Sequence, residues 1–518
     1  MLKDVIVKSK RRIKEMKKKI RDEYLKKWRV SIVNRPNVIL LLADDLGYGD
    51  LSCYGGVGVE TPNIDALLEH GVQFCDGYST SAVCTPARYS ILTGEYPFRN
   101  PNTRILPGNA PCIIEKEKGT LPKIFKKAGY RTAVVGKWHL GLGNNDLDWN
   151  KEISHTPNDV GFDYSYIFPA TNDRVPCVYL KNRLVENLDA TDPIEVSYEK
   201  ECPFDDIVTS KKNPELLRML HSHGHDNSIV NGVGRIGFMR GGKKAVWRDE
   251  DLAERFLEEA KGFIAEEKEK PFFLYYALHQ PHVPRVPNER FVGVSGLGPR
   301  GDVIAEMDYC VGELMAYLKQ ENLLENTIVI FSSDNGPVLD DGYMDDAVRQ
   351  NRMAFHHPAG PLRGGKYSRF EGGARVPMIV SWKSHITPSK SHALVSQVDF
   401  AASFAKMLHV DLEDWAVDSQ DMLDVLLGKT VKGRTEIFAE SEDKGYFLRQ
   451  GKWTYLPASD GPEYELYTNT ELGNSRDPQL YNMEYDVGQR ENVAQIHPDV
   501  TEKMEQRIKE IEKSSKTR

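Results

Sequence analysis

The sequence predicts an α/β fold in which a large, mostly parallel sheet carries helices on both faces. Two observations predict it: apolar runs that end in polar residues recur along the chain, and helical segments lie between them. The clearest run, residues 38–42 (VILLL), is typical of a strand buried on both faces. Alternating strands and helices favour a parallel sheet, which binds ligands beyond the carboxyl ends of its strands.

Further strands of this sheet are expected at 132–135, 272–277 and 327–331, and each again runs into polar residues. Helices are expected at 63–69, 121–128 and 250–267. Thr61-Pro62 opens the first of these helices, and Gly71 closes it.

The pattern changes after about residue 430, where short alternating runs begin. Strands are expected at 445–448, 453–456, 465–467 and 480–485, followed by a charged helix at about 500–513. We therefore expect a main domain over 31–430 and a small C-terminal subdomain over 431–518, built of an antiparallel sheet plus a helix. Residues 232–242 and 340–360 are expected to be long loops, which often bind substrate.

The first 30 residues differ from the rest of the chain in charge. The formal charge of the whole chain is −8, but residues 1–30 carry 13 Lys/Arg and 4 Asp/Glu, which leaves the body strongly acidic. Apolar residues such as Ile6, Ile13 and Ile20 fall near one face of a helix, so we expect a basic amphipathic leader helix. Packing on the body is favoured over attachment to a membrane surface or a polyanion.

This leader has no apolar run long enough for a conventional signal peptide or a membrane span. We therefore expect a cytoplasmic protein, or a periplasmic or secreted one if the true start differs. Neither a transmembrane segment nor a nucleic-acid partner is expected. The seven cysteines show no CxxC pair, which argues against a zinc finger or a dense disulfide framework.

The sharpest motif is Cys84-Thr85-Pro86-Ala87-Arg88, followed by Leu92-Thr93-Gly94. Thr85 can cap a helix and Pro86 can occupy its first position, so Cys84 should lie just before a helix start that favours anions. A cysteine there would have a depressed pKa, and a thiolate nucleophile is one interpretation. A buried cysteine at a helix start is the other.

Polar residues at the other strand ends supply metal ligands, cations and imidazoles. Asp44, Asp45, Asp334 and Asn335 offer four hard oxygen ligands suited to Ca²⁺ or Mg²⁺ and not to zinc. The candidate cations and imidazoles for an anionic substrate are Lys137, His139, His279, His282 and Lys366, with His356 and His357 expected in the substrate pocket. His221, His223, His225 and Asp226 could form a metal cluster, but an exposed polar loop is favoured.

Together these motifs, over roughly residues 34–490, resemble the formylglycine-dependent (type I) sulfatases of the alkaline phosphatase-like superfamily. The resemblance implies a large mixed sheet, a divalent ion held by Asp44, Asp45, residue 84, Asp334 and Asn335, and a maturation enzyme that oxidises Cys84 to formylglycine. It also implies catalytic roles for Cys84, Arg88, Lys137, His139, His282 and Lys366. Ala87 replaces the commoner serine of the motif, and the basic leader replaces an export signal.

The implied reaction is hydrolysis of a sulfate monoester to an alcohol and inorganic sulfate. Hydrated formylglycine would attack sulfur, His282 or Lys366 would protonate the departing alcohol, and His139 would act as the base. Because the loops near 220–245 and 340–360 are rich in His, Arg and aromatic residues, a sulfated carbohydrate is favoured as substrate. The alternatives are a formylglycine-dependent phosphodiesterase or phosphonate monoester hydrolase, and a non-catalytic binder of sulfated glycans.

Overall fold

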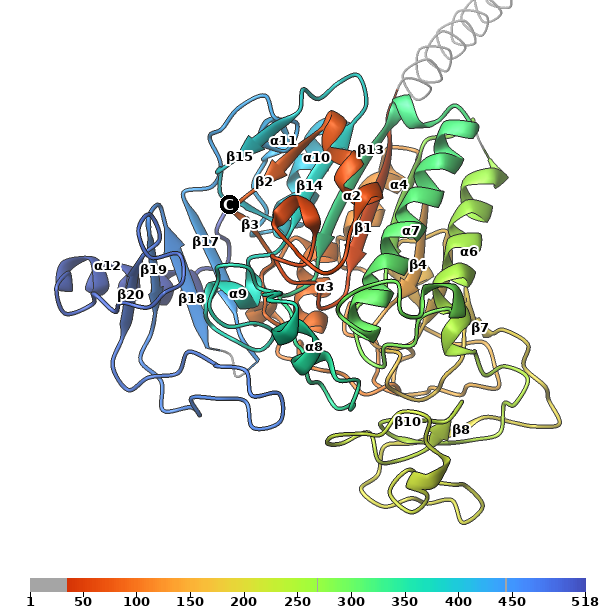
Figure 1. The fold of residues 1–518 in the computed structure, drawn as a ribbon. Coiled ribbons are helices and arrows are strands. Elements are labelled where there is room, and N and C mark those ends of the chain that lie inside the picture. Colours follow the sequence, from red (N-terminus) through yellow and green to blue (C-terminus); the bar gives the residue numbers. More distant parts are fainter. Residues whose placement is uncertain (1–34, 268, 443–444) are drawn as a thin grey trace, which may run out of the picture.

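The computed structural model describes residues 35–267, 269–442 and 445–518, which form an α/β body with a smaller sheet at its side (Figure 1). The expected leader helix at 1–30 lies outside the described residues. None of the described helices is long and apolar enough to cross a membrane. The seven cysteines all lie in the described part of the chain, and none of them forms a disulfide.

The body is organised around a ten-stranded sheet of order β15-β2-β14-β13-β1-β12-β4-β5-β6-β7. Its parallel centre consists of β13 (Thr327–Ser333), β1 (Asn37–Ala43), β12 (Phe272–Ala277), β4 (Arg131–Lys137) and β5 (Tyr164–Phe168). β14 (Met378–Trp382) runs antiparallel to β13. The outer strands are β2 (Gly71–Phe74), β15 (Ser389–Ser391), β6 (Leu180–Lys181) and β7 (Leu184–Val185).

Helices cover both faces of this sheet, as its buried central strands require. The rings of Phe272 and Phe273, adjacent on β12, must point to opposite faces. Phe272 contacts Phe263 of α6 (Leu252–Glu266), whereas Phe273 stacks on Phe125 of α4 (Leu121–Lys127). α7 (Pro299–Gln320) packs with α6 and with α2 (Pro62–Asp65), whereas α3 (Cys84–Thr93) and α10 (Phe400–Leu408) pack with α4.

The C-terminal segment forms the expected antiparallel sheet and helix. Its strands are β17 (Glu436–Glu440), β18 (Tyr446–Gln450), β19 (Trp453–Leu456) and β20 (Gln479–Asn482), with α12 (Pro498–Lys513) packed on β18 and β19. The strand expected at 465–467 is wrong, because these residues lie in a loop between β19 and β20. The α/β class with a large, mostly parallel sheet and a small C-terminal sheet is confirmed.

Shorter elements occupy the loops between these layers. Two small two-stranded antiparallel sheets, which lie at the lower edge of Figure 1, combine β8 (Glu195–Ser197) with β11 (Phe238–Arg240) and β9 (Ile229–Val230) with β10 (Val233–Gly234). The expected loop at 340–360 contains a helix, α8 (Ala347–Met353). The remaining elements are α5 (Pro157–Val160), α9 (Glu371–Ala374), α11 (Leu423–Leu426), β3 (Gly77–Tyr78) and β16 (Val395–Ser396).

Candidate active site

The carboxyl ends of the parallel strands bring the expected polar residues together. Ala43 at the end of β1 pairs with Ser333 at the end of β13, so Asp44-Asp45 and Asp334-Asn335 leave the sheet side by side. Lys137 ends β4 next to them, and His282 follows β12. The parallel register therefore places these side chains at one edge of the sheet.

Two of the carboxylates are paired with cations that are fully buried. The Nζ atom of Lys137 lies 2.7 and 2.6 Å from the two carboxylate oxygens of Asp44. Arg88, on the first turns of α3, donates from Nε to Asp334 at 2.9 Å, and its Nη2 atom forms an ion pair with the same carboxylate at 2.8 Å. Buried ion pairs of this kind hold the site rigid, because losing either partner leaves an isolated charge.

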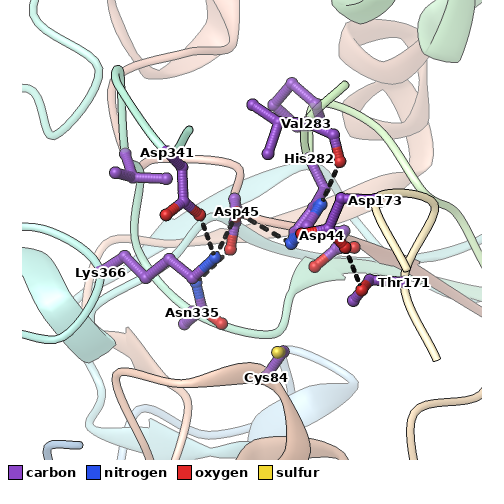
Figure 2. Close-up of polar contacts among 12 residues, drawn as sticks. Asp44, Asp45, Cys84, Thr171, Asp173, His282, Val283, Asn335, Asp341 and Lys366 are labelled. Atoms are coloured by element: carbon purple, nitrogen blue, oxygen red, sulfur yellow. Dashed lines mark hydrogen bonds and ion pairs between the residues drawn. The ribbon is translucent and has the colours of Figure 1, made fainter. Parts of the chain in front are cut away.

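Asp45 is the centre of a second group of contacts (Figure 2). Its carboxylate accepts hydrogen bonds from Lys366 Nζ and from Asn335 Nδ2, both at 2.8 Å. Lys366 also donates to Asp341 at 2.8 Å, so one ammonium group bridges two carboxylates. Figure 2 shows Cys84 pointing toward this group from the start of α3.

The donor set fits a divalent cation. Ligand atoms of Asp44, Asp45 and His282 lie within 4.8 Å of one another. The Oδ1 atom of Asn335 is buried without a hydrogen-bond partner in the described chain, which leaves an oxygen for a cation. Asp334, expected as a ligand, pairs with Arg88 through Oδ2 and accepts from the amide of Asp45 through Oδ1, and His282 joins the group.

Burial and nearby charges move the pKa values of these carboxyls in opposite directions. Burial, which outweighs the attraction of Lys137, raises the pKa of Asp44 well above its usual value. Burial acts in the same sense on Asp45, but Lys366 and Lys137 together lower its pKa. Two adjacent carboxyls thus have different proton affinities, which is typical of a site that lacks positive charge.

The structure argues against Cys84 as a thiolate nucleophile. Burial raises the pKa of its thiol, although Lys137 and Lys366 act to lower it. The expected depression of this pKa is therefore wrong, because loss of hydration outweighs the attraction of the two lysines. Cys84 is itself the first residue of α3, and the expected cap Thr85 donates instead to the carbonyl of His139 at 3.0 Å.

His139 lies against Cys84, with Nδ1 3.2 Å from Sγ. Its Nε2 is 3.1 Å from the carbonyl oxygen of Leu106, so Nε2 carries the proton and Nδ1 has the free lone pair. Burial, assisted by Lys137, holds the pKa of His139 well below its usual value, which keeps the ring neutral.

A backbone carbonyl also fixes the tautomer of His282, but here Nδ1 carries the proton and Nε2 has the free lone pair. Its Nδ1 lies 2.6 Å from the carbonyl oxygen of Val283, and its Nε2 lies 3.8 Å from Asp45. Burial lowers the pKa of His282 well below its usual value. A neutral ring therefore presents an Nε2 lone pair to the acidic cluster, which fits a cation between them.

A cavity of about 340 Å³ opens onto these groups. Four of the expected residues line it: Cys84, His139, His282 and Lys366. Arg88 and Lys137 are fully buried behind the wall and act on the cavity through the carboxylates. Such a volume suits a sugar-sized ligand.

The three histidines expected to bind substrate lie elsewhere. His279 packs between the rings of Phe168 and Phe256, and burial lowers its pKa to about 3. His356 is buried, and its Nε2 atom lies 2.9 Å from Asp50. The same carboxylate accepts hydrogen bonds from both terminal nitrogens of Arg300. His357 is exposed, and none of the three lines the cavity.

The interpretation of His221, His223 and His225 as an exposed loop is also wrong in part. His225 is buried and its Nε2 lies 2.9 Å from Asp173. His223 stacks on Tyr467 at 5.0 Å, and both rings line the cavity. No metal cluster forms at these histidines in the part of the chain that the structure describes.

Several lining residues were missed from the sequence. They are Ile105, Asp173, Arg174, Gly224, Ile236, Asp341, Tyr367 and Tyr467. Asp173 and Arg174 come shortly after the buried strand β5. Polar residues after a buried strand also predicted the other site residues, so the sequence did contain a signal for this pair. Tyr467 gives no such signal, because only the packing of the C-terminal subdomain brings it to the cavity.

Comparisons with known proteins agree with this geometry. A family model described as Sulfatase matches residues 36–410. An N-acetylgalactosamine-6-O-sulfatase of Bacteroides thetaiotaomicron is 48% identical over 479 residues, 92% of this chain and 93% of that protein. Human arylsulfatase A is 30% identical over 502 residues, 92% and 88% of the two chains.

A solved structure agrees over the same length. It is a sulfatase from work on the metabolism of multiple glycosaminoglycans by Bacteroides thetaiotaomicron, and it superposes with a TM-score of 0.91 at 48% identity. The alignment covers 93% of this chain and all of that one.

Proposed function

This chain belongs to the sulfatase family, and from that premise we propose that it hydrolyses the 6-O-sulfate ester of N-acetylgalactosamine in glycosaminoglycan-type sugars. The observation that carries the proposal is the 48% identity to an N-acetylgalactosamine-6-O-sulfatase along nearly the full length of both chains. The polar cavity next to Cys84 supports it, because its volume suits one sugar unit and its ester arm. The products are the free sugar alcohol and inorganic sulfate.

The balance of charge in the site supports a divalent ion as cofactor. Four carboxylates, Asp44, Asp45, Asp334 and Asp341, contact only three cations, Arg88, Lys137 and Lys366. An anionic sulfate ester would meet an excess of negative charge, and a divalent ion reverses that sign. When bound, such an ion supplies Lewis-acid stabilisation of charge on the sulfuryl oxygens.

We favour Ca²⁺ over Mg²⁺ for this position. The residues that would hold the ion are Asp44, Asp45, Asn335 and His282, with Asp334 adjacent. Ca²⁺ accepts many protein oxygens in flexible geometry, whereas Mg²⁺ retains several waters. A buried cluster with several protein carboxylates therefore suits Ca²⁺ better.

Conversion of Cys84 to formylglycine by a maturation enzyme is part of the proposal. A thiol with a raised pKa is a poor nucleophile, whereas the hydrated aldehyde supplies one hydroxyl for attack on sulfur and a second that, on losing its proton, re-forms the aldehyde and expels the sulfate. The Nδ1 atom of His139, 3.2 Å from the Cys84 sulfur, is placed to take a proton from that residue.

Lys366 is the better candidate for protonating the departing alcohol. Burial acts to lower its pKa, but Asp341 and Asp45 raise it well above its usual value, so the ammonium is charged. His282 is neutral, and its Nδ1 proton is directed to Val283. His282 therefore orients groups in the site, and Lys366 carries the available proton.

The test is sulfate release by protein produced together with a formylglycine-generating enzyme. We expect turnover of N-acetylgalactosamine 6-sulfate and none by the Cys84→Ala variant. Hydrolysis of an aryl sulfate but of no 6-sulfated sugar would contradict the proposed substrate. Preferential turnover of an aryl phosphonate monoester would instead favour the phosphonate hydrolase alternative. A cytoplasmic location stays a prediction.

A further inference from the structure

One wall of the cavity carries charged residues that the sulfate chemistry leaves unused. Asp173 and Arg174 line the same cavity as Cys84 and follow β5. Asp173 is only 3% exposed and accepts hydrogen bonds from His225 and Thr171. Buried charges that take no part in the reaction need another reason to be there.

The backbone of this wall is fixed by contacts from a distant part of the chain. The amide of Ile236 donates to the carbonyl of Asp173 at 2.9 Å, and the amide of Val175 donates back to the carbonyl of Ile236 at 3.1 Å. Arg235 donates to the carbonyl of Asn172 at 2.6 Å. The wall is therefore preorganised, as a recognition surface must be.

Arg174 keeps donors available for a ligand. Its side-chain hydrogen bonds to Thr171 and to both oxygens of Asp173 all leave from Nη1. Nε and Nη2 make no hydrogen bond to any residue that the structure describes. A guanidinium anchored by one nitrogen beside a carboxylate offers a donor and an acceptor side by side.

The chemistry of a 6-sulfated hexosamine decides what this pair would meet. When the sulfate lies at Cys84, the C6 arm leads directly to the ring carbon that neighbours C4. The galacto and gluco sugars differ only in the direction of the hydroxyl on C4. A polar pair in the same small cavity as the ester is thus placed near the one group that separates the two epimers.

We propose that Asp173 and Arg174 bind the C4 hydroxyl and its neighbour on C3, and so set a preference for galacto over gluco 6-sulfates. Arg174 donates to the hydroxyl oxygen, and the Asp173 carboxylate accepts the hydroxyl proton. The inverted epimer leaves the Nε and Nη2 donors of Arg174 without the hydroxyl partner, which is costly. The inference rests on the proposed function and names specificity residues for it.

The test compares kcat/KM for N-acetylgalactosamine 6-sulfate and N-acetylglucosamine 6-sulfate, with 4-nitrophenyl sulfate as a reference that lacks ring hydroxyls. For the wild-type protein we expect a galacto preference of roughly 100-fold or more. Asp173→Asn and Arg174→Lys should reduce that ratio to about 10-fold or less, with a smaller loss on the aryl sulfate. Asp206→Asn, a matched change of a carboxylate that is 68% exposed and does not line this cavity, should keep the ratio.

Each outcome decides between the proposals. A wild-type preference that survives in both variants overturns the role of Asp173 and Arg174 and leaves the proposed function intact. A wild-type protein that hydrolyses the aryl sulfate but neither sugar overturns the proposed function and this inference with it. Thermal unfolding of each variant shows whether it folds. If Asp173→Asn does not fold, the substrate preference of Arg174→Lys alone tests the proposal.

Discussion

Asn335 has an unusual position for a buried side-chain amide. Its Nδ2 atom donates to Asp45 at 2.8 Å and to the carbonyl of Gly336 at 2.9 Å. Its Oδ1 atom has no partner among the described residues, and such an oxygen costs free energy unless something binds it. A divalent ion between Asp44, Asp45 and Asn335 would satisfy the oxygen and separate the two carboxylates.

Removal of divalent ions therefore should lower the thermal stability of the protein. We expect chelation to reduce the unfolding midpoint and Ca²⁺ to restore it, with a gain of about 2.7 kcal/mol at a hundredfold excess over Kd. Asn335→Leu should weaken this Ca²⁺ response. Asn351→Leu, which removes another buried amide with an unpartnered Oδ1 atom, on α8 and outside the acidic cluster and the cavity lining, should retain it. An unchanged response in Asn335→Leu would contradict the assignment.

Residues at strand ends could be predicted from the sequence, but partners set by distant packing could not. Asp44, Asp45 and Lys137 follow apolar runs that could only be buried strands, and parallel strands end at one edge. His356 was assigned to the pocket from its sequence alone, yet Asp50 and Arg300 hold it in the interior. No local pattern in the sequence shows that Asp50, which is already paired with Arg300, also contacts His356.

α7 (Pro299–Gln320), the longest helix in the described part of the chain, was not expected from the sequence. Its buried positions include Arg300, Asp302, Glu306 and Asp308 among the apolar residues. A periodic apolar stripe is the main signal of a helix, and buried charges interrupt it. The central strands were easier, because burial on both faces makes an unbroken apolar run, as in residues 38–43 of β1.

Glu306 on α7 should make stability depend on pH. Burial raises the pKa of this carboxyl to about 7 from its usual value of 4.5, so the folded protein binds a proton that the unfolded chain has released. The free energy of unfolding should fall as pH rises from about 4.5 to about 7, by about 3 kcal/mol at most. Above the window the contribution of the protonated form is lost.

Urea unfolding of the wild type and of Glu306→Gln across that pH window measures the effect. The difference in unfolding free energy between the two proteins should shift in favour of the Gln variant as pH rises. Glu313→Gln, on the same helix and 41% exposed, provides the matched control and should track the wild type. Parallel curves for the wild type and Glu306→Gln would show that Glu306 does not titrate as expected.

At the scale of the whole molecule, the C-terminal sheet is joined to the body by a buried ionic network. Glu371, at the start of α9, accepts from Tyr78 of the body at 2.6 Å and from Thr454 of β19 at 2.8 Å. It also pairs with Arg375 and, across the junction, with Arg449 of β18. The same subdomain supplies Tyr467 to the cavity, so the junction positions part of the active site.

Replacing Glu371 with Ala should destabilise the whole protein. Two buried guanidinium groups would lose a carboxylate, which costs roughly 3–5 kcal/mol when one partner of a buried ion pair is removed. Chemical denaturation measures this loss, and Glu484→Ala, whose carboxylate is 59% exposed, should change stability far less. A Glu371→Ala protein as stable as the wild type would show that the network does not join the two sheets.

The central claim is that Cys84 is the precursor of the nucleophile and not the nucleophile itself. The most direct measurement is the mass of the peptide that contains residue 84, taken from active protein produced with a formylglycine-generating enzyme. We predict a mass that corresponds to replacement of the thiol by an aldehyde, in a fraction that scales with sulfate-releasing activity across preparations. Full activity in a preparation whose residue 84 is entirely an unmodified thiol would contradict the account.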